Sequence, residues 1–85
     1  MTTHTDRITL ITNAHPDLDA DTARMLLMAK SYVATRIAGV KPKELDSVME
    51  EFTEMLCDWE TQQVLDLAGE VGAGIGYPVT GQQTQ

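Results

Sequence analysis

The sequence has a single cysteine, Cys57, in 85 residues. An intrachain disulfide is therefore excluded, and so is a structural zinc site built on several cysteines. Cysteine usage of this kind fits a reducing compartment. Long apolar runs are also missing, because the longest, residues 25–29, is far too short to cross a bilayer, and no secretory signal pattern is visible. We therefore expect a protein with no membrane partner.

Basic residues are scarce: the chain has 6 Lys and Arg against 13 Asp and Glu, for a net charge of −7. Acids and bases balance in residues 1–40, so the whole excess lies in residues 41–85. This charge argues against tight nucleic-acid binding, which depends on Lys and Arg at phosphates. A chain of this length forms one small domain with a thin core, and such a domain gains stability from a partner or from self-association.

Motifs that would carry catalysis or metal binding are absent as well. The segment "DLDADT" (17–22) begins like a calcium loop, but Thr22 and Met28 stand where that loop needs Gly and Glu. No serine has a G-x-S-x-G context, and the only histidines are His4 and His15. We expect no catalytic residue, no cofactor and no metal, and therefore no enzyme.

What the chain does have is helical periodicity. A helix is predicted over residues 20–38, with Asp19 as its N-cap and Gly39 as its left-handed C-terminal cap. A second amphipathic helix is predicted over residues 43–68, with a bend or break near Thr61 where its apolar pattern fades.

Residues 6–14 fit either a short strand or a short helix, and His15-Pro16 ends that element. The predicted fold class is all-α: a small bundle in which two main helices form a hairpin and a short N-terminal element packs against them.

The chain ends in "GEVGAGIGYPVTGQQTQ", from Gly69 to Gln85. This segment lacks the Gly-Lys-Ser/Thr of a P-loop and the strand and helix that flank a dinucleotide fingerprint. Its alternating apolar residues are typical of an extended segment that adds to a neighbour's surface, and a disordered tail is the alternative. The predicted division is a helical domain over residues 1–68 and an extended arm over 69–85. The predicted docking residues of the arm are Val71, Ile75, Tyr77, Pro78 and Val79.

One short segment suggests a carrier protein. Asp46-Ser47-Val48 resembles the Asp-Ser-Leu of small acidic acyl carrier proteins, whose serine receives phosphopantetheine at a helix N-terminus. The resemblance covers about a dozen residues, and the predicted helix begins before Ser47. A carrier modified at Ser47 is therefore kept as an alternative.

A longer resemblance points elsewhere. The segment "ARMLLMAKSYVATRIAGV", followed by a helix that holds "MLCDWETQQ", is similar to the gp6-like head–tail connector (adaptor) proteins of tailed bacteriophages. The shared pattern covers residues 17–63. It departs from the family at residues 60–63, where the group often shows Asn-Arg. The matching residues are the capping Asp19, then Leu26, Leu27, Ala29, Tyr32, Val33, Gly39 and the late Trp59.

The resemblance implies a structural virion protein at the neck, made in the host bacterial cytoplasm. Such proteins form a homo-oligomeric ring under the portal, extend the DNA channel without binding DNA specifically, and give the tail or a stopper protein a docking surface. A helical interaction module or assembly chaperone without a phage context is the further alternative. The predicted core or ring-interface residues are Leu26, Leu27, Tyr32, Val33, Phe52, Leu56 and Trp59, and the predicted channel-facing acids are Glu50, Glu51, Glu54 and Glu60.

Overall fold

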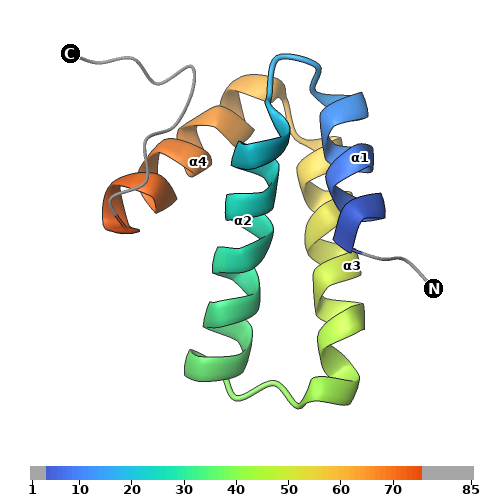
Figure 1. Ribbon diagram of the computed structural model, residues 1–85, viewed down its shortest axis with the longest axis vertical. Helices are drawn as coiled ribbons and strands as arrows, with labels where there is room; N and C mark the ends of the chain where they lie inside the picture. The colour runs from blue at the N-terminus through green and yellow to red at the C-terminus, as the bar shows by residue number, and fades with distance from the viewer. Residues whose placement is uncertain (1–3, 76–85) are drawn as a thin grey trace.

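The computed structural model describes residues 4–75, and these residues form helices with no strand among them (Figure 1). The predicted all-α class is confirmed. The elements in chain order are α1 (His4–Ala14), α2 (Ala20–Tyr32), the π-helical turn η1 (Val33–Ile37), α3 (Pro42–Asp58) and α4 (Thr61–Ile75).

The ambiguous N-terminal element is the helix α1. It ends at Ala14, and the next residue, His15, precedes a proline that disfavours helical geometry. Ile8 and Ile11, three residues apart, lie on the buried side of α1. The burial of these two side chains against the other helices favours a helix over a strand, a choice that the nine residues 6–14 alone did not settle.

Both predicted caps of the first long helix are present. The Asp19 carboxylate accepts the Thr22 backbone N–H at 3.0 Å, and Gly39 has a φ of +74°. The Val40 N–H donates to the Ala34 carbonyl at 2.8 Å, which closes the helix end in the manner of a Schellman motif. The last turn of the helix, η1, is widened to π geometry, which the sequence pattern did not predict.

The single helix predicted over residues 43–68 is two helices, and the predicted break is confirmed. Trp59 has an extended backbone, with φ −71° and ψ 159°. The Glu60 N–H then donates to the Gln63 side-chain oxygen at 3.1 Å, as in a capping box that starts α4. The backbone N–H of Glu60, just before α4, thus finds its acceptor within the "ETQQ" segment itself.

The start of the predicted arm was placed wrongly, because α4 continues through residues 69–75. Val64, Ala68 and Gly72 recur every four residues and are all buried, so this face of α4 packs closely despite the low helix propensity of glycine. The remaining arm residues Tyr77, Pro78 and Val79 lie outside the described residues.

Helices α2 and α3 run antiparallel as a hairpin, with α1 packed against both and α4 against α2 (Figure 1). The end of the hairpin at the α2–α3 connection extends beyond both α1 and α4 (Figure 1). All four α-helices and the α1–α2 loop contribute to one core: Ile8, Ile11, Leu18, Ala23, Met25, Leu26, Leu27, Met49, Leu56, Val64 and Ala68.

Candidate assembly surface

The residues predicted to form a core or a ring interface separate into two groups. Leu26, Leu27 and Leu56 are fully buried, and Phe52 and Trp59 are partly buried against the same core. All five side chains hold the helices of one chain together. Leu26, Leu27 and Leu56 are therefore not available to a partner, whereas Phe52 and Trp59 keep part of their surface exposed. Tyr32 and Val33 differ, with 61% and 44% of their area exposed.

Tyr32 and Val33 belong to an exposed apolar stripe along α2 and η1. With Met28 at 59% exposure and Ile37 at 70%, they follow one another at helical spacing along the exposed face of α2 and η1. We call these four residues the α2 stripe. Single exposed apolar residues are ordinary on a protein surface, whereas a contiguous set marks a contact surface.

Three residues of the stripe, Met28, Tyr32 and Val33, line a groove between α2 and α4 that has a volume of about 650 Å³. Its walls are almost entirely apolar, with Asp21 and Arg24 as the charged lining residues. Val71, predicted to belong to the docking arm, is instead a residue of α4 that packs against the core and lines this groove. A concave apolar surface of this kind accommodates apolar side chains of a partner.

The four predicted channel-facing acids are all exposed. Glu50, Glu51 and Glu54 lie on α3, whose opposite face is buried through Met49 and Leu56. Glu60 lies in the connection between α3 and α4. Because α3 has no basic residue after Lys43, the exposed face of this helix is acidic, and Lys30 of α2 is a base that lies beside it at Phe52.

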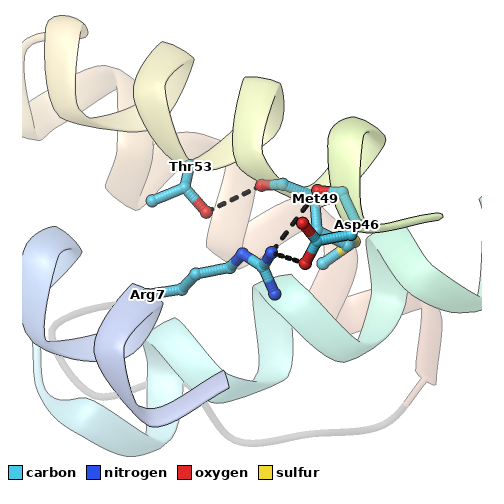
Figure 2. A network of polar contacts seen from close by, with 4 residues as sticks. All are labelled: Arg7, Asp46, Met49 and Thr53. Carbon is cyan, nitrogen blue, oxygen red and sulfur yellow. Dashed lines mark hydrogen bonds and ion pairs between the residues drawn. The ribbon is translucent and has the colours of Figure 1, made fainter. Parts of the chain in front are cut away.

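An arginine that the sequence pattern did not single out connects α1 to α3. Arg7 is 7% exposed, and its guanidinium donates from Nη2 to the Asp46 carboxylate and to the Asp46 carbonyl (Figure 2). Its Nε is buried and has no hydrogen-bond partner in the described part of the chain. One turn further along α3, the Thr53 hydroxyl donates to the Met49 carbonyl at 2.8 Å (Figure 2). Arg7 and Asp46 are separated by 39 positions in the sequence, so no local pattern predicts the pair.

A second polar contact missed by sequence analysis lies at the junction of three helices. His15 is 2% exposed, and its ring Nε2 lies 2.6 Å from the Leu56 carbonyl while Nδ1 lies 2.8 Å from the Thr61 hydroxyl. Since a carbonyl only accepts, Nε2 donates, and in the neutral ring Nδ1 accepts from Thr61. His15 thus fixes the end of α3 and the start of α4 to the end of α1, which is a structural role.

The carrier alternative depends on Ser47. This residue is exposed, but it is the sixth residue of α3, whereas the carrier motif places its serine at a helix N-terminus. The preceding Asp46 is paired with Arg7. These positions give the carrier alternative no specific support.

Cys57 is half-buried, and its thiol donates to the Leu10 carbonyl at 3.5 Å. Burial raises the pKa of the Cys57 thiol, and the neighbouring Asp58 and Glu54 carboxylates raise it further. A thiol held in its neutral form is a poor nucleophile, so this position has the character of a packing residue.

Residues 4–75 contain no group of three or more His, Cys, Asp or Glu side chains placed to hold a metal ion. Within the same residues no helix combines the length and the apolar character needed to cross a membrane. No family model, no curated protein and no solved structure matches this chain.

Proposed function

We propose that this protein is a structural virion protein, a head–tail connector that forms a ring under the phage portal and presents a docking surface to the tail or a stopper protein. The α2 stripe carries this proposal. A small domain that leaves four neighbouring large apolar side chains exposed is suited to be a subunit of an assembly.

The size of the stripe fits assembly on a template. Complete burial of one large apolar side chain is worth roughly 1.5–3 kcal/mol. Because these four side chains are already partly covered, burying the rest contributes on the order of 4 kcal/mol altogether. Association costs roughly 4–15 kcal/mol in lost freedom, so one such contact is weak. A ring in which each subunit contacts two neighbours and the portal combines several weak contacts into one stable position.

The acidic side of α3 supports a place next to DNA in transit. Glu50, Glu51 and Glu54 are exposed and project from one side of α3. In a ring that turns this side inward, the carboxylates repel the phosphates, so DNA slides without adhering. Reversing the exposed Glu50 and Glu60 to lysine should slow DNA release from assembled particles. Unchanged release kinetics would remove the channel-wall part of the proposal.

The direct test is binding to the portal ring of the phage that encodes this chain, followed by electron microscopy of the complex. Wild-type protein should form a ring on the portal. The double variant Met28→Ser and Ile37→Ser should fold normally, because both side chains are exposed, and should fail to assemble. Leu10→Ser is the matched control, since Leu10 is 50% exposed but lies on α1 outside the stripe.

The contribution of the arm is tested separately by deleting residues 76–85, which leaves α4 complete. Loss of portal binding with unchanged helicity would support a docking role for this segment. A protein that never binds a portal but binds another protein through the α2 stripe would be a helical interaction module, and the connector proposal would be wrong. A mass increase on incubation with a phosphopantetheinyl transferase would identify the carrier alternative.

A further inference from the structure

Charge is sharply divided along the hairpin. Residues 36–43, "RIAGVKPK", carry three bases and no acid, whereas residues 44–60 carry seven acids and no base. We call residues 36–43 the basic tip, which forms the end of the hairpin at the α2–α3 connection (Figure 1). The protein therefore presents a cationic end and an anionic side, although its net charge is −7.

The basic tip also carries an apolar side chain. Ile37 is 70% exposed, more than any other exposed large hydrophobic residue among those that the structure describes. Arg36 precedes it, and Lys41 and Lys43 follow where the chain enters α3, all with exposed side chains. An exposed isoleucine among three bases fits a partner surface that has an apolar hollow beside carboxylates.

The side of α3 has such a hollow. Val48, Phe52 and Met55 line it together with Glu51 and Lys30, and its volume is about 220 Å³. Met55 is itself 36% exposed, and the Lys30 ammonium lies 5.5 Å from the centre of the Phe52 ring. Glu51 is a lining residue, and Glu54 lies one turn beyond it on the acidic side. We call this the α3 hollow.

We infer that the basic tip of one copy of this chain docks on the α3 hollow of a second copy, with Ile37 in the hollow and the tip bases against Glu51 and Glu54. Ile37 lies at the α2–α3 end of the hairpin and is not a lining residue of the hollow in its own chain, so the occupant comes from a second copy. The inference rests on the proposed function and deepens it, since it names the contact between neighbouring subunits of the ring. Glu51 and Glu54 then belong to the subunit contact, which leaves Glu50 and Glu60 as the exposed acids that face the channel.

Charge decides the occupant and the geometry. A tip against a tip, or an α3 side against an α3 side, brings like charges together, so a two-fold contact through either surface is disfavoured. A tip against an α3 hollow sets the tip bases against Glu51 and Glu54, with Lys30 as the one base in the lining of the hollow. When the second copy does not return the same contact about a two-fold axis, the contact is heterologous and closes into a ring or extends as a filament. A DNA duplex is a poorer occupant of the tip, because the acidic remainder of the chain repels it.

The experiment is analytical ultracentrifugation of the full chain at low and high salt. Wild-type protein should associate, and added salt should weaken the association because charge pairs contribute to it. Ile37→Asp removes the tip contact, and Glu51→Lys with Glu54→Lys removes the hollow contact. Each variant should weaken association by about tenfold or more. Asp17→Lys with Glu70→Lys makes the same charge change away from both surfaces and should leave the association intact.

Mixing shows that a tip binds a hollow, and the size of the wild-type assembly shows the geometry, because a reciprocated two-fold contact stops at a dimer whereas a heterologous one continues to a ring or filament. The tip variant retains a hollow and the hollow variant retains a tip, so an equal mixture should form a dimer and nothing larger. A chain that combines Arg36→Glu and Lys41→Glu with Glu51→Lys and Glu54→Lys should regain association. Recovery in the reversed chain would show that the charges pair with one another.

Several results would overturn the inference. One is wild-type protein that stays monomeric at millimolar concentration and low salt; another is association that both surface variants leave unchanged. A third is a set of tip variants that lose binding to a DNA duplex but keep self-association, because the tip would then bind DNA phosphates instead of a second copy. The portal assay is independent: self-association through these surfaces without portal binding would refute the proposed function alone. Portal binding by a protein that makes no tip contact would refute the inference alone.

Discussion

Replacing His15 by leucine should destabilise the junction of three helices while leaving its volume nearly filled. Leucine fills a similar volume at this position, which is 2% exposed, but its side chain cannot donate to the Leu56 carbonyl or accept from the Thr61 hydroxyl. Leu56 is one of the last four residues of α3, which ends at Asp58, so its backbone carbonyl has no hydrogen-bond donor within the helix.

The magnitude follows from these two contacts. An unpaired buried carbonyl costs about 1–3 kcal/mol. The Thr61 hydroxyl is half-buried and reaches water more easily, so the loss of its hydrogen bond to His15 adds less to the cost. We expect a loss of about 2–3 kcal/mol from a domain whose whole stability is roughly 4–13 kcal/mol. At about 4–8 °C per kcal/mol, the melting temperature should fall by roughly 10–20 °C.

Urea unfolding followed by far-UV circular dichroism measures the loss, and amide hydrogen exchange locates it. Protection should fall most in α4, because its first turn loses its attachment to His15. Thr61→Val is the matched control, since it removes only the Nδ1 partner and should cost about 1 kcal/mol or less. The reasoning is refuted if His15→Leu unfolds within about 0.5 kcal/mol of the wild type with an unchanged denaturant slope.

Three further predictions concern single positions. Gly39→Ala should destabilise the protein by about 1 kcal/mol, because the backbone φ is +74°, although no atom lies within 4 Å of the added Cβ. Gly74→Ala also adds a Cβ in open space, but inside α4, and should stabilise the protein by a few tenths of a kcal/mol. Thermal melts compare the two variants. Asp46→Ala should cost about 1–3 kcal/mol in urea unfolding by removing the acceptor of the buried arginine, and a neutral result would contradict the pairing. Iodoacetamide should alkylate Cys57 only slowly at neutral pH, because its raised pKa keeps the thiol protonated until the pH is well alkaline. Asp58→Asn should shift the alkylation profile to lower pH, and an unshifted profile would exclude the carboxylate as a cause.

Local chemistry predicted the helix ends well. Asp19 and Gly39 act within a few residues of their own positions, so their capping roles can be seen in the sequence. The break near Thr61 was visible as a lapse in apolar periodicity, and Gln63 three residues after Glu60 was an unused signal for the capping box.

Composition misled the prediction where tertiary packing opposed it. Glycines at positions 69, 72 and 74 suggested an extended arm, yet α4 includes all three. The reason is that Ala68 and Gly72 continue a buried face that begins at Val64, and contact with the rest of the bundle offsets the weak helix propensity of the glycines. Likewise Tyr32 and Leu26 follow the same helical pattern, but only the packing of α1, α3 and α4 determined which of the two is buried.

The sequence by itself determined the helical class, the caps and the acidic side of α3, because periodicity, capping and charge act over a few neighbouring residues. Only the tertiary structure decided which apolar side chains remain exposed as the α2 stripe and which polar ones are buried. Arg7 meets Asp46 across 39 residues, and His15 meets Leu56 across 41. Contacts over such separations depend on how the helices pack, and that is fixed by the whole core rather than by any segment of the chain.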